Sequence, residues 1–570
     1  MSGPAAEQVF HSGKIITVDS GFRIAQAVAI AGGRFIAVGS NADVQRHATV
    51  ATQMVDLKGR SVVPGLIDGH AHADREGLKL VFPALGKVRS IADILDRIAE
   101  LVCAAKPGEW IVTMPIGDPP TYFNVPDILA ERRFPTRQDL DRVAPDNPVY
   151  IRAIWGFWRH TKPLVSIANT RALELAGITR DTRPPLSTIS IEKDAAGEPT
   201  GVFVEDTLMP VMELTLMRCA PGFTHADRVR TLPLAMRAYH AFGTTSIFEE
   251  HGVAAELMRA YKEVHRAGAL TMRTALVASP DWEFLPDVPF ERVMSSWFGW
   301  LSEPSFGDDF LRVTGLFVSM DVEEENIVRS RALPYTGWAG FHYHSALPRA
   351  RLKELLIACA RNRIRVTCIR RNMLELFDEV NRVVPIGDLR WVFGHISALT
   401  PDEVSRVRDL GLAVTTHTNR YVYKEGHLLK QRLGAARENE ISPLRSLTAA
   451  GVKVSLGTDN VPVSMFHPMW QAVARKSLYT GETIAPAEKL SREDALRAST
   501  INGAWLTFEE NQKGSIEPGK LADLAILSAD PLTVEEDALK DISSDMTIVG
   551  GKTVWSSYLK NPNLAADKRG

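Results

Sequence analysis

Cysteine is scarce in this sequence. Only four cysteines occur in 570 residues, at positions 103, 219, 359 and 368, and no two of them form a Cys-x-x-Cys pair. So few and so scattered, they exclude the disulfide framework of a small secreted protein. We therefore expect a protein of a reducing compartment, and the sequence predicts a cytoplasmic location.

Long apolar runs are absent as well. No stretch of about 18 apolar residues occurs, so we expect no segment that crosses a membrane. The opening residues, MSGPAAEQVF, contain no basic region followed by an apolar one. This pattern predicts that the chain carries no signal peptide.

The sequence also lacks a surplus of charge of either sign. The chain has 66 basic and 68 acidic residues, which leave a formal net charge of -2. That balance creates no strong field toward nucleic acid or an anionic membrane, and we expect neither as a partner. The hydrophobic content of 45% is ordinary for a globular protein. A homo-oligomer is compatible with these numbers.

Both ends of the chain contain short strand patterns separated by glycine turns. These patterns are Val9–Val18, Ala27–Ile30, Arg34–Val38, Leu524–Leu527 and Met546–Trp555. Neither end alone has enough strands to enclose a core. We therefore predict that residues 1–60 and 515–570 together form one β-sandwich domain.

Between the ends, short apolar strands alternate with helical patterns such as 352–361 and 401–410. The eight candidate strands are Ser61–Ile67, Thr244–Phe248, Met272–Val277, Leu311–Val318, Arg363–Ile369, Arg390–Phe393, Leu412–Thr415 and Val452–Leu456. This alternation indicates an α/β fold with a parallel sheet, and eight such units predict a (β/α)₈ TIM-like barrel over residues 61–514. The stretch from about 75 to 235 is too long for one connection. It predicts an inserted subdomain, with Pro148–Ile154 as one of its strands.

Two histidines follow the first barrel strand. In Val62-Val63-Pro64-Gly65-Leu66-Ile67-Asp68-Gly69-His70-Ala71-His72, an apolar strand ends in His70 and His72. A spacing of two residues on a strand directs both side chains to one face, where they can hold a divalent metal. The alternative is a chance pair on the surface, since the chain has a second such pair at His342 and His344.

The segment from Pro64 to His72 resembles the first-strand metal motif of the amidohydrolase superfamily. Other segments are similar to the YtcJ-like (amidohydrolase 3) branch of that superfamily, and they occur in the same order along nearly the whole chain. They are Pro135–Asp141 with Ala144–Val149, Asn169–Leu173, and Gly514–Leu524.

The resemblance implies two further ligands. Asp459, in Gly457-Thr458-Asp459-Asn460, matches the eighth-strand aspartate of the family, which binds metal and accepts a proton from the attacking water. His395, in Phe393-Gly394-His395, matches the sixth-strand histidine. The alternatives are an ordinary turn aspartate and a structural histidine.

Several other residues are candidates for contact with the metal or the substrate. Glu205 belongs to the expected insertion and is equally well explained as an acid at a helix start. Glu249, Glu250 and His251 follow the second barrel strand, and His342 and His344 follow the fourth. Loop positions exposed to solvent are the alternative for these. The aromatic run at 154–160 either lines a pocket for a flat or hydrophobic substrate or belongs to the subdomain core.

The sequence departs from the family at two ligand positions. Thr367 stands where the fifth-strand histidine is expected, and Phe317 stands where relatives carry a fourth-strand lysine. Both losses concern ligands of a second metal. We therefore predict one divalent ion per chain, held by His70, His72, Asp459 and His395. Imidazole and carboxylate ligands suit zinc, although iron and manganese are compatible with them.

These observations predict a metal-dependent hydrolase that cleaves an amide-type carbon–nitrogen bond of a small organic substrate with metal-activated water. Asp459 is the predicted catalytic residue. One alternative is a regulatory or scaffolding subunit that has lost catalysis, because Thr367 and Phe317 replace family ligands. Another is a different metal-dependent reaction, such as deamination or lyase chemistry, because one barrel fold supports many reactions.

Overall fold

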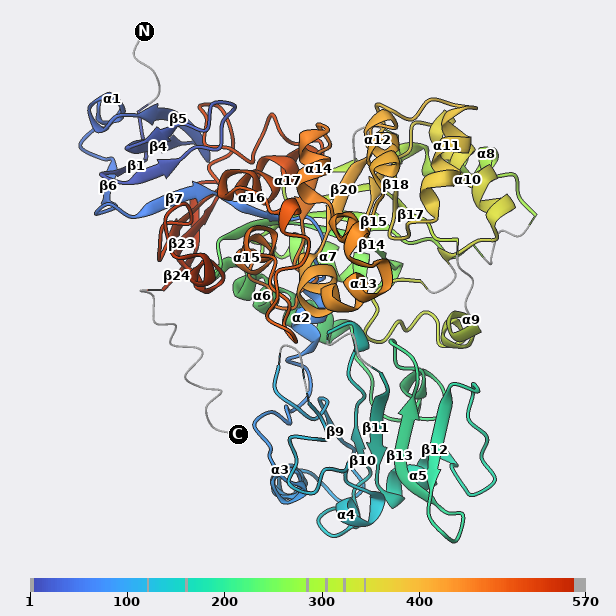
Figure 1. Ribbon diagram of the computed structural model, residues 1–570. Coiled ribbons are helices and arrows are strands. Elements are labelled where there is room, and N and C mark those ends of the chain that lie inside the picture. The colour runs from blue at the N-terminus through green and yellow to red at the C-terminus, as the bar shows by residue number, and fades with distance from the viewer. Residues whose placement is uncertain are drawn as a thin grey trace.

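The computed structural model describes residues 5–119, 122, 124–158, 162–282, 287–302, 306–320, 324–342 and 345–557. At the centre of the described chain, eight parallel strands pair in chain order. The first and last of them meet where the Gly69 amide donates a hydrogen bond to the Leu456 carbonyl at 2.9 Å. The predicted (β/α)₈ barrel is thereby confirmed. Figure 1 shows it between the terminal domain and a separate lobe formed by the insertion.

The barrel strands and the helices around them have the following bounds. The strands are β8 (Leu66–Asp68), β14 (Thr244–Val253), β15 (Arg273–Ala278), β17 (Leu311–Phe317), β18 (Val366–Cys368), β19 (Val392–Phe393), β20 (Ala413–Thr416) and β21 (Val454–Leu456), and β16 (Phe306–Gly307) pairs with β17. The helices are α2 (Ala73–Leu78), α6 (His225–His240), α7 (Ala255–Arg266), α8 (Phe290–Val293), α9 (Glu324–Ser330), α10 (Arg349–Arg361), α11 (Met373–Asn381), α12 (Pro401–Asp409), α13 (Gly426–Leu433), α14 (Leu444–Ala449), α15 (Phe466–Ala474), α16 (Arg492–Ala498) and α17 (Ile501–Leu506).

Local chemistry explains where these helices begin. Thr400 caps α12: its hydroxyl accepts from the Glu403 amide, the Glu403 carboxylate accepts from the Thr400 amide, and Pro401 takes the first helical position. This reciprocal cap satisfies amides that have no partner inside the helix. The helical patterns predicted at 352–361 and 401–410 are confirmed by α10 and α12.

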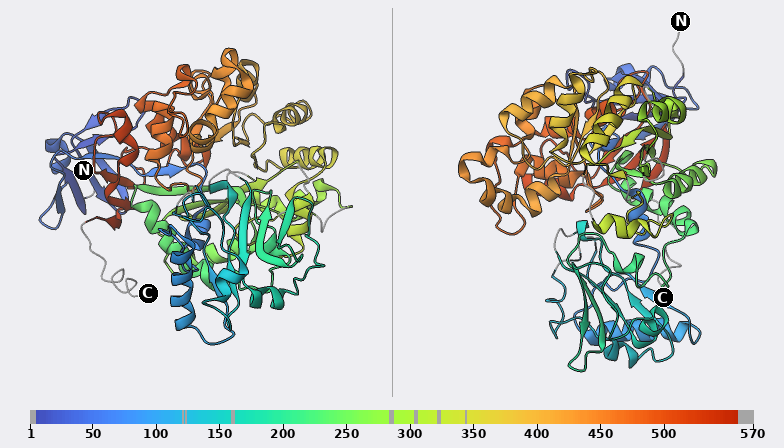
Figure 2. Two further views of the ribbon diagram at one scale, coloured as in Figure 1. Left: turned by 60° about the horizontal axis from the view of Figure 1, so that its bottom comes forward. Right: turned by 90° about the vertical axis from the view of Figure 1, so that its right-hand side faces the viewer.

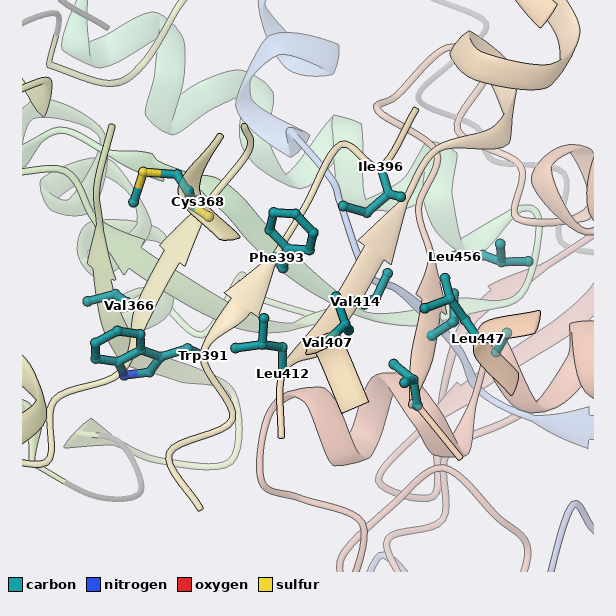
Figure 3. Packing of buried hydrophobic residues seen from close by; sticks show 14 of the residues in the cluster. Val366, Cys368, Trp391, Phe393, Ile396, Val407, Leu412, Val414, Leu447 and Leu456 are labelled. Atoms are coloured by element: carbon teal, nitrogen blue, oxygen red, sulfur yellow. The ribbon is translucent and has the colours of Figure 1, made fainter. Parts of the chain in front are cut away.

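Alternation along the strands separates two layers of the core. Phe393 on β19 and Val414 on β20 pack outward against the helices, beside Val407 of α12, as Figure 3 shows. Their neighbours Val392 and Ala413 belong to a different cluster, which also contains Phe248, Ala275 and Phe317 and fills the barrel interior. Both faces of these strands are therefore apolar, as expected of a buried parallel sheet.

Strands from the two chain ends share one sheet. Its order is β24-β23-β22-β7-β2-β3, so C-terminal and N-terminal strands are neighbours; a four-stranded sheet, β5-β4-β1-β6, lies beside it. The bounds are β1 (Gln8–His11), β2 (Lys14–Ile16), β3 (Ile24–Ala25), β4 (Ala27–Ala31), β5 (Arg34–Gly39), β6 (Gln53–Asp56), β7 (Ser61–Pro64), β22 (Leu524–Leu527), β23 (Ser544–Val549) and β24 (Lys552–Ser556), with α1 at Asn41–Gln45. Phe10, Val28, Val62, Leu524 and Ile548 belong to one buried cluster of this domain. Figure 1 shows the blue and red segments side by side.

The insertion forms a sheet of its own, in the order β12-β13-β11-β10-β9. Its elements are α3 (Ile91–Ala104), β9 (Ile111–Thr113), α4 (Arg137–Asp141), β10 (Val149–Ile151), β11 (Leu164–Ala168), α5 (Thr170–Ala176), β12 (Ile189–Lys193) and β13 (Pro199–Glu205). The strand predicted at 148–154 is β10. The right-hand view of Figure 2 shows this lobe protruding from one side of the barrel.

One predicted strand requires a correction. The sequence suggests a single strand at 61–67, but the structure divides it into β7, which pairs with β2 and β22, and β8, which pairs with β14. The break falls at Gly65, where a Cβ atom would lie 2.1 Å from the Thr245 hydroxyl oxygen. The chain passes from the terminal domain into the barrel at this glycine because no side chain fits there.

Among the described residues, no helix combines the length and apolar character needed to cross a membrane.

Truncation after Leu521 tests the shared sheet. The truncated chain loses β22, β23 and β24, which cover the apolar side chains of β2, β4 and β7. We expect it to aggregate, because a contiguous apolar surface is exposed. A control truncation after Ser557 keeps every described strand and should remain monodisperse in size-exclusion chromatography. A soluble Leu521 truncate that unfolds cooperatively on heating would contradict the account.

Candidate metal centre

The candidate ligands lie where barrel strands end. His70 and His72 follow β8, His395 follows β19, and Asp459 follows β21. The carboxyl ends of the strands in this fold face a common mouth, which is where barrel enzymes place functional groups. Strands far apart in the sequence thus bring these side chains together.

The side chains of His70 and His72 converge. Both are buried, and their Nε2 atoms lie 3.2 Å apart. Gly457, just after β21, makes room for this pair, because a Cβ atom there would lie 2.4 Å from the Cβ of His70. The glycine lets β21 approach β8 closely enough for Asp459 to reach the same point.

Asp459 completes a triangle with the two histidines. Its Oδ1 lies 3.2 Å from Nε2 of His72 and 3.7 Å from Nε2 of His70. Its backbone amide donates to the His70 carbonyl at 2.8 Å. The residue has φ of +53°, in the left-handed region that few non-glycine residues adopt, and His395 has φ of +55°. Such strained positions gather at functional sites.

His395 approaches the same point from the other side. Its Nε2 lies 3.4 Å from Nε2 of His70. Burial and the adjacent imidazoles of His417 and His70 hold the pKa of His395 well below its usual range. The ring is therefore neutral, which is the form that binds metal.

A carboxylate stands behind each histidine of the β8 pair. Glu250 contacts Nδ1 of His70 at 2.5 Å, and Glu249 contacts Nδ1 of His72 at 3.2 Å. Alternation along β14 directs Glu250 to Thr415 across the barrel and Glu249 to Tyr261 on α7. Each Nδ1 is therefore occupied by a carboxylate, and each Nε2 is left facing the cluster. Carboxylates behind the ligands of metal sites orient histidines in the same way.

Charges at the site oppose the effect of burial. Burial alone would raise the pKa of Asp459, but its contact with His72 and the nearby His417 and His70 imidazoles hold it well below its usual range. Burial would lower the pKa of His70, but Glu250 and Asp459 raise it. Asp459 is therefore ionised, and it can bind a cation or accept a proton.

Asp68 joins the two loops that carry the cluster. It is fully buried and accepts hydrogen bonds from the amides of His70 and Thr458 and from the Thr458 hydroxyl. Burial raises the pKa of Asp68 to about 6, although these hydrogen bonds lower it. The loops after β8 and β21 are thus tied together by one side chain.

A cavity of about 580 Å³ opens above the cluster and reaches both His395 and Asp459. Barrel residues form one wall, and Trp155 and Phe157 of the insertion form another. The flat side chains on its surface are Trp155, Phe157, His251, Phe317, Phe341 and Tyr421. Two of the predicted aromatic residues, Trp155 and Phe157, therefore line the pocket. Trp155 also belongs to a buried apolar cluster, together with Trp158.

Some sequence candidates lie away from the cluster. Glu205 is buried in the insertion, where its carboxylate accepts from the amides of Val211 and Met212, and burial raises its pKa to about 7. His342 is half-buried, and its amide donates to the Ser279 hydroxyl at 3.3 Å. The candidate His344 lies outside the described residues.

The positions that depart from the family pattern are buried in the barrel. Thr367 on β18 pairs with Phe317 on β17 and with Val392 on β19. Phe317 packs on the His251 ring, with centroids 4.9 Å apart. His251 also stacks on Phe341 at 4.4 Å. An aromatic wall thus stands where a lysine is expected.

His417 is a residue of the cluster that no pattern in the sequence predicts. It follows β20 directly, is 1% exposed, and its Nδ1 lies 4.0 Å from Oδ2 of Asp459. The available signal was its place after the strand predicted at 412–415, which is the same kind of place that marks His395. The family resemblance gives no ligand there.

The donor atoms fit a metal ion. Two sets of three residues each bring their ligand atoms within 4.8 Å of one another, namely His70, His72 and Asp459, and His70, His395 and His417. Ligands held tetrahedrally about 2.0–2.1 Å from zinc are about 3.3–3.4 Å apart, and the contacts around His70 and His72 are close to this separation.

Comparison with known proteins defines the class of this protein. A family profile described as "Amidohydrolase family" matches residues 53–555, which is most of the chain. The chain therefore belongs to the amidohydrolase family. The resemblance to YtcJ is confirmed: the putative amidohydrolase YtcJ of Bacillus subtilis is 24% identical over 566 residues, covering 96% of this chain and 99% of the relative.

Two further relatives match over nearly their full length. N-substituted formamide deformylase of Arthrobacter pascens is 26% identical over 565 residues, covering 94% of this chain and 96% of the relative. Protein LONG AFTER FAR-RED 3 of Arabidopsis thaliana is 25% identical over 572 residues, covering 97% and 92%.

Solved structures share the fold. An uncharacterized metal-dependent hydrolase from Pyrococcus furiosus superposes with a TM-score of 0.65 at 21% identity, covering 92% of this chain and 100% of that chain. An adenosine deaminase from Xanthomonas campestris with bound zinc gives a TM-score of 0.54 at 15% identity, covering 100% and 97%. At these identities the likeness shows the fold alone.

Substitution of Glu250 by glutamine tests the carboxylate behind His70. The change keeps the size of the side chain but removes the charge that orients the imidazole and makes it more basic. We expect zinc affinity, measured by competition with a chelator, to fall about 10–100-fold with the fold intact. The matched control is Glu263→Gln, because Glu263 contacts His225 at 2.8 Å on the surface. Equal zinc affinity of the Glu250 variant and the wild type would contradict this role.

Proposed function

We propose that the protein is a metal-dependent hydrolase that cleaves an amide-type carbon–nitrogen bond of a small organic substrate. The observation that carries the proposal is the convergence of Nε2 of His70, Nε2 of His72 and Oδ1 of Asp459 within 3.2–3.7 Å, beneath a cavity. Membership in the amidohydrolase family supports it, and so does the name of the Arthrobacter relative, which identifies an enzyme acting on formamides.

The residues favour one ion rather than two. His70 belongs to both ligand sets, but only its Nε2 faces the cluster, because Nδ1 contacts Glu250. One nitrogen binds one ion. Thr367 and Phe317 offer no ligand on the side where family members bind a second. We propose zinc as this ion, held by His70, His72, His395 and Asp459.

The bound ion would polarise the substrate carbonyl and lower the pKa of water. Asp459 acts as the base. Its ionised carboxylate removes a proton from the water that attacks the carbonyl carbon. It then delivers that proton to the nitrogen as the carbon–nitrogen bond breaks, which yields a carboxylic acid and an amine. His70 and His72 keep their orientation because Glu250 and Glu249 hold their Nδ1 atoms.

The cavity favours a flat substrate with a polar acceptor. Aromatic rings of the insertion and the barrel offer stacking surfaces on its walls. Arg75, a residue that is 3% exposed, also lines the cavity. Its guanidinium donates to the Ala339 carbonyl and lies 4.9 Å from the Trp155 ring centroid. A buried guanidinium facing a cavity suits a carbonyl or carboxylate oxygen. We therefore propose aromatic N-acyl compounds as the first substrates to screen.

The scaffolding alternative has less support. A subunit without catalysis has no need of the paired carboxylates Glu249 and Glu250, whose burial is costly unless they position something. Deamination is distinguished by its product. If the protein releases ammonia from an aromatic amine and cleaves no amide, the site is a deaminase rather than an amide hydrolase.

Substitution of Asp459 by asparagine tests the proposed base. Asparagine keeps the size and tolerates a φ of +53°. It cannot take a proton from water, so we expect kcat for the best amide substrate to fall at least about 10²-fold. The circular dichroism spectrum should be unchanged.

The control for this variant is Asp194→Asn. Asp194 occupies an exposed turn and accepts hydrogen bonds from the amides of Ala196 and Glu198, a role that asparagine also fills. Its kcat should equal that of the wild type. If the well-folded Asp459 variant also turns over at the wild-type rate, Asp459 is a turn residue and the proposed mechanism is wrong.

A further inference from the structure

His417 is a buried histidine without a hydrogen-bond partner in the described part of the chain. It is 1% exposed, and neither Nδ1 nor Nε2 makes a hydrogen bond. A polar group buried in this way is costly, and native structures retain one where it serves a purpose. An imidazole can offer one of its two nitrogens to a metal ion as a ligand.

The ring lies against the proposed ligands. Its centroid is 4.5 Å from that of His395 and 5.2 Å from that of His70. A ligand atom of His417 lies within 4.8 Å of the ligand atoms of both. Asp459 stands between the two sides of the cluster, with Oδ1 near His72 and Oδ2 near His417. On its other side the ring lies beside Tyr421, with ring centroids 5.1 Å apart.

The loss on the fifth strand makes room for a ligand from another strand. Thr367 has a side chain too short to reach the position of a histidine, and its hydroxyl is buried without a hydrogen-bond partner among the described residues. His417 follows the seventh strand, beside the strand that carries His395. The imidazole missing from β18 is thus matched by one that β20 supplies.

We propose that His417 is a ligand of the catalytic ion and replaces the histidine that the fifth strand lacks. The ion is then held toward β19 and β20, by His417 and His395 in addition to His70, His72 and Asp459. This inference rests on the proposed function, because it assumes that the site binds a metal. The proposed function already includes His395 after the sixth strand and Asp459 after the eighth. The present inference adds a ligand from the seventh strand.

Substitution of His417 by leucine tests the proposal through metal binding rather than activity. Leucine fills similar space and removes both unsatisfied nitrogens. We expect the metal-free variant to melt at or above the temperature of the metal-free wild type. Its zinc affinity, measured by chelator competition on the full chain, should fall at least about tenfold, so zinc should raise its melting temperature less.

The matched control is His251→Leu. His251 is a histidine of the same cavity, with its ring centroid 6.2 Å from that of His72, but it belongs to neither ligand set. Its replacement should leave zinc affinity unchanged. The cobalt-substituted wild type and this control should share one visible absorption spectrum, and the His417 variant should differ from both.

Anomalous diffraction from zinc-loaded wild-type crystals keeps the test decisive if the leucine variant misfolds. We expect a nitrogen of His417 about 2.0–2.1 Å from the ion. A wild type that binds zinc with His417 beyond bonding distance, or a His417 variant with wild-type affinity and cobalt spectrum, would overturn the proposal and leave the hydrolase function standing. A wild type that binds no zinc would instead overturn the proposed function.

Discussion

The pairing of His70 with Glu250 and of His72 with Glu249 is the interaction on which the site depends. It fixes which nitrogen of each imidazole faces the cluster, and it does so across β8 and β14, which are adjacent strands separated by a long insertion in the sequence. A slip of one residue between these strands would turn each carboxylate to the opposite face. The register of β14 against β8 therefore decides whether the two carboxylates can orient the two histidines.

The remainder of the centre follows from bringing β21 against β8. Gly457 allows that approach, Asp68 ties the two loops, and Asp459 takes a left-handed conformation beside His72. The result concentrates carboxylates and imidazoles in a buried space, and a divalent cation bound there would stabilise the folded state. The insertion adds Trp155 and Phe157 to the cavity above, so the chemistry sits in the barrel while substrate contact is shared with the lobe.

Much of this could be predicted from the sequence, for physical reasons. The barrel strands are short apolar runs, and His70, His395 and Asp459 each stand just after one, so their convergence follows from the fold. The boundary between β7 and β8 could not be predicted, because both strands are apolar and only the crowding by Thr245 separates them. The roles of Glu249 and Glu250 could not be predicted either, because they depend on the pairing of β14 with β8 and not on a local sequence motif.

His417 was missed for a related reason. Its neighbours are threonines with no distinctive spacing, and the family resemblance directs attention to the fifth strand instead. Glu205 is the opposite case, a sequence candidate that lies away from the cluster. An acid at the end of an apolar strand can also accept hydrogen bonds from backbone amides within a subdomain. Only the tertiary contacts distinguish these two outcomes.

The most direct test of the account is the metal content of the purified full chain, measured by elemental analysis beside a His70→Gln/His72→Gln double variant. His70 belongs to both sets of candidate ligands, and only its Nε2 faces the cluster. We therefore expect one divalent ion per wild-type chain and none in the double variant. Two ions per wild-type chain, or equal metal content in both proteins, would contradict it.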